Sequence, residues 1–112
     1  MKVENTKAQM RKGVLEYCIL GVLEQGELYP SDIITKLKDA KLIIVEGTLY
    51  PLLTRLKDAG LLTYRWEESR SGPPRKYYKL TPVGEKFLME LDQTWDELAQ
   101  AVKKTTRRTL RS

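Results

Sequence analysis

The sequence contains no histidine and only one cysteine among its 112 residues. Histidine is the side chain that most often serves as a general base or a metal ligand near neutral pH. Cys18 therefore has no histidine partner for nucleophilic chemistry and no second cysteine for an internal disulfide, and we expect a buried thiol. A phosphate-binding loop of the form GxxxxGK(S/T) is also missing. These absences disfavour an enzyme, and no residue pattern predicts a metal site or a cofactor.

Long hydrophobic runs are absent as well. No stretch approaches the roughly 18 apolar residues that a membrane span needs, and the polar N-terminal segment MKVENTKAQMRKG has no signal-peptide pattern. We therefore expect a cytoplasmic protein. Hydrophobic residues still make up 41% of the chain, which suits a small folded core, and the length predicts one domain.

The positive charge of the chain is concentrated at one end. The formal net charge is +5, and the segment 103–112, KKTTRRTLRS, holds five basic residues and no acidic one. The remainder is balanced, with 15 basic and 15 acidic residues. Overall charge is therefore weak evidence for nucleic-acid binding, and only the local distribution of charge can argue for it.

Apolar periodicity predicts three helices in the first half of the chain. The first spans residues 7 to about 25, and the second spans 31–40 with Ser31 as its N-cap. The third begins near Glu46 or Gly47 and ends before Gly60. Pro51 then falls in about the first turn of the third helix, where a missing N–H costs little because it has no intrahelical acceptor.

The third helix has two distinct faces. Its four leucines fall within about a third of the circumference at 100° per residue, whereas the opposite face carries Thr48, Pro51, Thr54 and Arg55, with Tyr50 on the flank. Such a face fits a helix that enters a major groove N-terminus first. Two alternatives stay open, namely an ordinary solvated face and a Tyr50 ring that packs on the second helix.

A β-hairpin follows the three helices. The blocks LLTYRWEE and RKYYKL are typical of strands, and SRSGPP between them predicts a six-residue loop. Residues 63–79 contain five basic and two acidic residues, so the hairpin is the basic part of an otherwise neutral body. We expect Trp66 to lie in the core.

Thr81 and Pro82 predict the start of a fourth helix, as an N-cap followed by proline at the first helical position. This helix should run to about residue 105 and carries one long apolar stripe. A small domain has too little core to cover such a stripe, so we expect a second copy of the chain to cover it. The alternative is that its first two turns pack on the first helix. The predicted dimer residues are Phe87, Leu91, Trp95, Leu98 and Val102.

Three helices followed by a basic hairpin predict a winged helix-turn-helix, a mainly α fold with a β-hairpin wing (α+β). We assign residues 7–80 to this domain, 81–105 to a C-terminal dimerisation helix and 106–112 to a basic tail. The tail either follows DNA phosphates or is a disordered solubilising end.

Two strings carry a resemblance to a known family, EGTLYPLLTRLKDAGLL and GPPRKYYKLTPVG. The chain resembles the PadR family of bacterial transcriptional regulators over residues 10 to about 102, and its single C-terminal helix is similar to the compact subclass. GELYPSDI at 26–33 departs from the family, which often has a Gly-Tyr pair at the start of the second helix.

The resemblance implies a homodimeric repressor that binds a pseudo-palindromic operator in double-stranded DNA. The recognition helix would present Thr48, Tyr50, Pro51, Thr54 and Arg55 to the groove. Arg75 and Lys76 would meet phosphates or the minor groove, and Lys7, Arg11 and Lys12 would add backbone contacts.

Trp95 has two interpretations. Paired across a dimer, the two indoles would form a slot for a flat aromatic effector, as in some compact members of the family. The simpler interpretation is a large interface residue. The alternative to the whole assignment is a winged-helix protein-interaction module that never binds DNA; a neutral wing would favour it, and this wing is basic.

Overall fold

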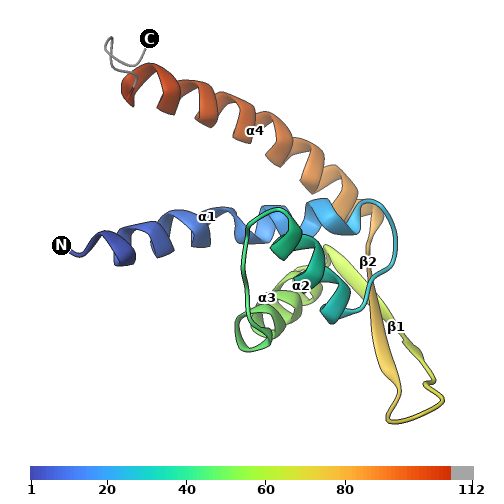
Figure 1. Cartoon of the computed structure of the whole chain (residues 1–112). Helices are drawn as coiled ribbons and strands as arrows, with labels where there is room; N and C mark the ends of the chain where they lie inside the picture. The colour runs from blue at the N-terminus through green and yellow to red at the C-terminus, as the bar shows by residue number, and fades with distance from the viewer. Residues whose placement is uncertain (107–112) are drawn as a thin grey trace.

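The computed structural model describes residues 1–106, which form four helices and one two-stranded antiparallel sheet (Figure 1). The three helices of the N-terminal half are α1 (Val3–Leu23), α2 (Pro30–Asp39) and α3 (Glu46–Asp58). The strands β1 (Leu62–Glu67) and β2 (Arg75–Leu80) form the hairpin, and α4 (Pro82–Thr106) follows. The α+β winged-helix class predicted from the sequence is therefore confirmed. Residues 107–112 of the predicted basic tail lie outside the described part of the chain.

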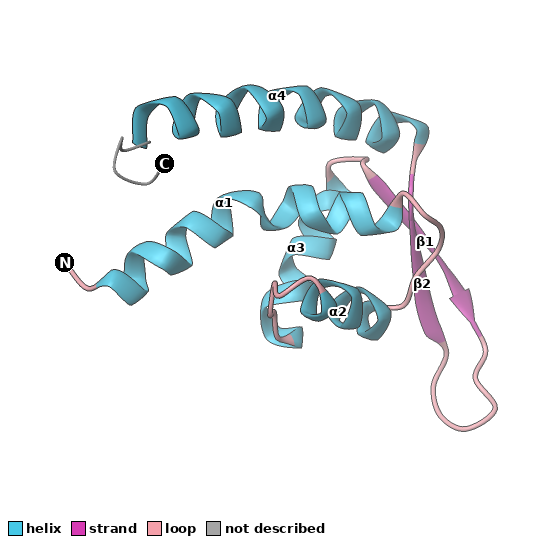
Figure 2. Cartoon of the chain, turned by 45° about the horizontal axis from the view of Figure 1, so that its top comes forward, coloured by secondary structure: helices cyan, strands magenta, loops and turns pink. Residues whose placement is uncertain are grey.

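The core lies where the C-terminal half of α1, the helices α2 and α3 and the base of the hairpin meet (Figure 2). Apolar periodicity places one buried stripe on each of these elements, and the stripes face one another. α4 contributes Leu88 at its domain end. The most deeply buried large side chains are Ile19, Leu20, Leu23, Ile33, Leu37, Leu49, Leu53 and Leu88.

Two long helices project from this core. α1 begins at Val3, four residues before the predicted start, and its first half lies beyond the core, so that Met10 is 71% exposed. α4 starts against α1 and diverges from it toward the C-terminus (Figures 1 and 2). Both ends of the described chain consequently lie on the side of the molecule away from the wing.

The N-cap predicted for α2 is wrong by two residues. The helix begins at Pro30, and Tyr29 occupies the N-cap. The Tyr29 N–H donates to Oδ2 of Asp32 at 3.2 Å, which satisfies an N–H that the helix itself leaves without an acceptor. Ser31 instead lies inside the first turn, because Pro30 has the backbone angle that suits the first helical position.

Pro51 lies deeper in α3 than predicted. Since the helix begins at Glu46, Pro51 falls in the second turn and not the first. An N–H at this position would donate to the carbonyl of Gly47, so the explanation from end-of-helix N–H groups is wrong. The helix persists because Leu49 and Leu53, on either side of the proline, are fully buried and their packing offsets the missing hydrogen bond.

The junction between the hairpin and α4 is tightly built. The predicted N-cap is confirmed, since the Gly84 N–H donates to Oγ1 of Thr81 at 2.9 Å and the helix begins at Pro82. The Thr81 hydroxyl donates to the Gly60 carbonyl at 2.7 Å. A Cβ added to Gly84 would lie 2.0 Å from the carbonyl oxygen of Leu61. Only glycine therefore lets α4 approach the end of α3 this closely.

Candidate nucleic-acid interface

The outer face of α3 does not pack against the core, as its sequence pattern predicts. Leu49, Leu53 and Leu56 are buried. All five predicted recognition residues are exposed, and the Tyr50 ring is 46% exposed. The exposed residues are Thr48, Tyr50, Pro51, Thr54 and Arg55.

The hairpin has a loop of seven residues, 68–74, because Glu67 pairs directly with Arg75. Not all of its basic residues are available to a ligand, because Arg65 is already paired with two carboxylates. Arg65 Nε donates to Glu27 Oε2 at 2.7 Å, and Arg65 Nη1 donates to Glu67 Oε2 at 2.6 Å. These two carboxylates raise the pKa of Arg65 and engage two of its three donor nitrogens. Arg65 is thus a structural cation that ties the wing to the α1–α2 connection.

One face of the hairpin is fastened to the start of α2 by stacked rings. Tyr77 stacks on Tyr29 with ring centroids 3.8 Å apart. The guanidinium of Arg65 lies 4.7 Å from the centre of the Tyr77 ring, and that of Arg75 lies 5.2 Å from the Tyr29 ring. Arginine stacked on aromatic faces in this way holds the wing at a fixed position relative to the helices.

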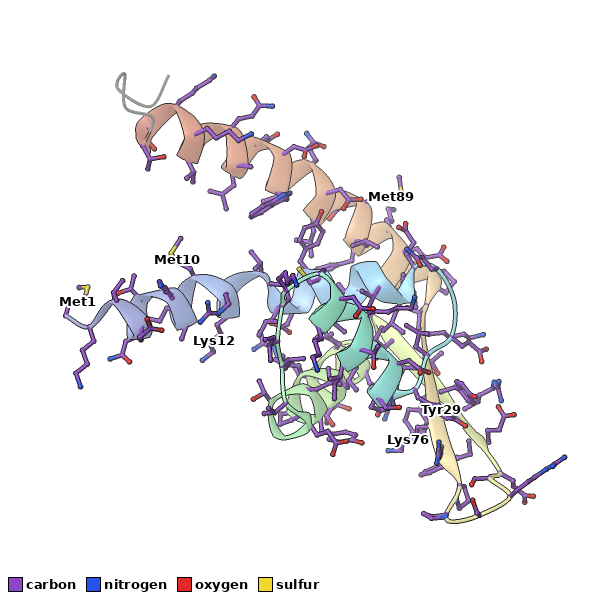
Figure 3. The ribbon with its side chains drawn as sticks, viewed as in Figure 1. Met1, Met10, Lys12, Tyr29, Lys76 and Met89 are labelled. Carbon is purple, nitrogen blue, oxygen red and sulfur yellow. The ribbon has the colours of Figure 1, made fainter. Side chains whose placement is uncertain are left out.

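The opposite face of the hairpin carries Lys76 on a platform of two rings. Its Nζ lies 4.5 Å from the centre of the Tyr64 ring and 5.1 Å from that of Trp66. Attraction between the ammonium and the ring faces restricts the otherwise flexible lysine. Lys76 and Tyr29 lie close together at the edge of the hairpin that faces the helices (Figure 3), and both line the same cleft.

A cleft of about 490 Å³ separates the wing from α2 and α3. Four residues predicted from the sequence line it, namely Tyr50 and Thr54 from α3 with Arg75 and Lys76 from β2. The structure therefore brings together two groups that are at least 21 residues apart in sequence. Its other lining residues are Tyr29, Pro30, Ser31, Glu46, Trp66, Pro74 and Tyr78.

The prediction that Trp66 lies in the core is wrong, since its side chain is 60% exposed. Trp66 shares a face with Leu62 and Tyr64, but exposure increases along β1 as the hairpin extends past the helices: Leu62 is 2% exposed and Tyr64 is half-buried. Alternation along a strand predicts which face a residue occupies. It does not show how far the covering helices extend.

Two other sets of predicted DNA contacts lie away from the cleft. Arg55 forms an ion pair with Glu16 of α1, with Nε and Oε2 3.4 Å apart. Lys7, Arg11 and Lys12 lie on the projecting half of α1, where Lys7 also pairs with Glu4 at 3.7 Å. Figure 3 shows Lys12 far from both Tyr29 and Lys76.

The apolar stripe of α4 remains largely uncovered in the single chain. Phe87, Trp95, Leu98 and Val102 are between 41% and 52% exposed, whereas Leu91 is half-buried against the core. Tyr17 of α1 approaches the stripe, with its ring 6.4 Å from that of Trp95 and its hydroxyl donating to Asp92 Oδ1 at 2.6 Å. The same hydrogen bond raises the pKa of Tyr17 to about 12, because ionising the hydroxyl would remove the proton it donates to Asp92.

Within residues 1–106 no group of three or more histidine, cysteine or acidic side chains is arranged to hold a metal ion. Cys18 is only partly buried, contrary to expectation, and burial raises the pKa of its thiol above the ordinary value. Among the described residues, no helix is both long and apolar enough to cross a membrane.

A model of the Transcriptional regulator PadR-like family matches residues 19–90. Among solved structures, a PadR-like transcription factor from Bacteroides fragilis is 62% identical, covers 91% of this chain and 99% of its own, and has a TM-score of 0.78. A PadR family transcriptional regulator from Eggerthella lenta is 33% identical, with coverages of 96% and 90% and a TM-score of 0.81.

A third similar structure is that of Bacillus subtilis PadR in complex with operator DNA. It is 33% identical, with a TM-score of 0.65, and the match covers 70% of this chain but 46% of that one. By sequence, the Bacillus subtilis negative transcriptional regulator PadR is 35% identical over 82 residues, and this chain spans 43% of its length.

Proposed function

The chain belongs to the PadR-like family of transcriptional regulators, and on this premise we propose that it is a homodimeric repressor that binds a pseudo-palindromic operator in double-stranded DNA. The observation that carries the proposal is the cleft between α3 and the wing, where Tyr50 and Thr54 face Arg75 and Lys76. The relative whose structure contains operator DNA has the same fold over 70% of this chain.

On the DNA side, the proposal assigns different roles to the two walls of the cleft. An α-helix fits the major groove, and in helix-turn-helix proteins the N-terminal residues of the recognition helix approach the base edges. Thr48 and Tyr50 are exposed in the first turns of α3, and Thr54 is exposed one turn after Tyr50. Arg75 and Lys76 contact phosphates, which supplies affinity and register without sequence choice.

The proposal gives Arg55 and the basic residues of α1 no groove contact. Arg55 is held by Glu16, on the flank of α3 away from the cleft. Lys7, Arg11 and Lys12 lie on the arm of α1 that extends away from the wing.

The dimer proposal rests on the uncovered faces of α1 and α4. The two helices pack together at their domain ends and diverge beyond them (Figure 2). Along the diverging parts, Met10 on one side and Trp95, Leu98 and Val102 on the other remain exposed. A second copy related by a two-fold axis supplies a matching apolar helix for this space, since each chain then covers the face that the other leaves open.

A flat aromatic effector beside Trp95 is a further part of the proposal. The 42% exposed indole lies near the Tyr17 ring, so a dimer axis close by would create an aromatic slot. Titration with planar aromatic compounds should quench tryptophan emission in the wild type, but not in Trp95→Phe. Equal quenching of both proteins would contradict a site at Trp95.

Fluorescence anisotropy tests the DNA proposal. The purified chain is titrated onto a labelled duplex from upstream of its own gene and onto a scrambled duplex, across a salt series. We expect preference for the upstream duplex and an affinity that falls steeply with salt, because phosphate contacts release counterions. Weak and equal binding to both duplexes at every salt concentration would instead favour a protein-interaction module.

A further inference from the structure

Trp66 is a large exposed aromatic side chain that has no role in the proposed function. It is 60% exposed on a wing whose other exposed tip residues are mainly polar, glycine or proline. Trp66 lines the cleft together with Tyr29, Tyr50 and Pro74, and exposed apolar side chains gathered in this way mark a binding surface. Trp66 is also held in place, because its ring meets that of Tyr64 edge-on, with centroids 5.9 Å apart and planes at 89°. It is therefore presented to the cleft in a fixed orientation.

The geometry of a DNA duplex indicates which part of the DNA would lie next to Trp66. When a helix occupies the major groove and the adjacent hairpin reaches the flanking groove, the strand that separates the two grooves must run between helix and hairpin. In this chain that space is the cleft, with Tyr50 and Thr54 on the α3 side and Trp66, Arg75 and Lys76 on the wing side. The cleft is therefore in the right place to hold a sugar–phosphate strand of the DNA.

The chemistry of the two walls matches such a strand. Arg75 and Lys76 provide two cations against the single carboxylate of Glu46, so the cleft favours an anion. The Trp66 ring provides an apolar surface of the kind that packs on deoxyribose, and its indole N–H is a hydrogen-bond donor. Because Lys76 Nζ lies 5.1 Å from the Trp66 ring, the same ring also restrains the ammonium that would meet the phosphate.

We infer that Trp66 is a DNA-contact residue, which packs on the sugar of the strand in the cleft and holds Lys76 toward the neighbouring phosphate. The inference rests on the proposed function, because it needs the chain to bind DNA. It concerns the sugar–phosphate backbone alone, and it therefore predicts the same contact on operator and on scrambled duplex at low salt. Lys76 supplies the salt-dependent part of the contact, and Trp66 supplies a part that salt does not screen.

Fluorine NMR of the full chain labelled with 5-fluorotryptophan tests the contact directly. The chain has two tryptophans, so two resonances are expected, and Trp66→Phe identifies the one from the wing. On addition of duplex we expect the Trp66 resonance to shift or broaden. A Trp66 resonance that stays unchanged while anisotropy reports a bound duplex would overturn the inference and leave the proposed function standing.

Affinity measurements supply the second arm of the test. We expect Trp66→Ala to weaken binding about tenfold with an unchanged salt slope, and Trp66→Phe to lose less. Lys76→Gln should instead lower the slope of log affinity against log salt by about one. Met89→Ala is the matched control, since Met89 is 69% exposed on α4, and Figure 3 shows it well away from the wing.

The outcomes separate the two proposals. Wild-type affinity in Trp66→Ala would contradict the inference, whatever the operator preference. If the wild type binds scrambled and upstream duplex equally but the Trp66 resonance still shifts, the strand contact holds and sequence-specific repression is wrong. If no duplex binds at low salt, both proposals fail. Should Trp66→Ala prove unstable in thermal unfolding, Trp66→Phe keeps the packing against Tyr64 and carries the comparison.

Discussion

The wing and the C-terminal half of α4 project from the same small core, and each exposes a tryptophan, but the two tryptophans have opposite surroundings. Trp66 lies beneath the ammonium of Lys76, with Arg75 lining the same cleft. Trp95 follows Asp92 and precedes Asp96, and its exposed neighbours on the stripe are Leu98 and Val102. An aromatic ring among cations suits a polyanion, whereas an apolar stripe flanked by carboxylates repels one. In our proposal, the charge beside each ring distinguishes the surface for DNA from the surface for a second copy.

The largest effect should come from breaking the α4 surface. Leu98→Glu combined with Val102→Glu places two carboxylates on the stripe, and we expect a monomer whose operator affinity falls by about 3 kcal/mol, since only one half-site remains engaged. Light scattering and anisotropy measure the two effects. Met89→Glu, which adds a charge to the outer side of the same helix, should remain dimeric. A double variant that stays dimeric would show that α4 is not the interface.

The second-largest effect should come from a change at the junction between α4 and the core. Gly84→Ala forces a methyl group against the Leu61 carbonyl, and we expect a loss of about 2–3 kcal/mol in the free energy of unfolding by denaturant titration. Gly13→Ala is the control, because a Cβ there has no neighbour within 4 Å, and it should be neutral or slightly stabilising. Equal stabilities for the two variants would contradict the close packing at this junction.

A smaller effect is expected from the cations of the wing. Arg75→Ala combined with Lys76→Ala should weaken operator binding by about 1.5–2 kcal/mol and flatten its salt dependence, because two phosphate contacts disappear. The melting temperature should change little, since both side chains interact with rings at the surface. Wild-type affinity and salt slope in this variant, measured by anisotropy, would mean that the wing does not meet DNA.

The smallest effect is expected at Arg55. In its ion pair with Glu16 the Arg55 side chain is 74% exposed, and surface pairs of this kind contribute about 0–1 kcal/mol. Arg55→Ala should therefore leave both stability and operator affinity close to wild type in the same two assays. A large loss of sequence preference in Arg55→Ala would show that this arginine leaves Glu16 and meets a base edge.

The sequence predicted the order and type of every described element, because apolar spacing of 2.0 or 3.6 residues is a local property of the chain. It also predicted the exposed face of α3 and the start of α4 at Pro82. The ends of α1 and the cap of α2 were wrong by two to four residues. These ends depend on competing local hydrogen bonds, such as the one from Tyr29 to Asp32, which spacing alone does not rank.

The cleft could be predicted only in part. Tyr50 and Lys76 followed from helix faces and from basic composition. Trp66 was wrongly placed in the core, and Arg55 was expected beside Tyr50 but lies away from the cleft. Whether Trp66 is covered depends on where the helices end beside the hairpin. Whether Arg55 is available depends on a carboxylate 39 positions earlier in the chain, at Glu16. Both are tertiary properties, and no periodicity within one element contains them.

The number of chains bound to one duplex tests the central claim most directly, that the wing side binds DNA while α4 joins two copies. Native mass spectrometry of the full chain with the duplex from upstream of its gene gives this number. We predict two chains per duplex. We also predict that the variant with Arg75→Ala and Lys76→Ala remains a dimer of two chains in the absence of DNA. One chain per duplex at saturating protein, or a complex that forms equally with scrambled duplex at moderate salt, would contradict the account.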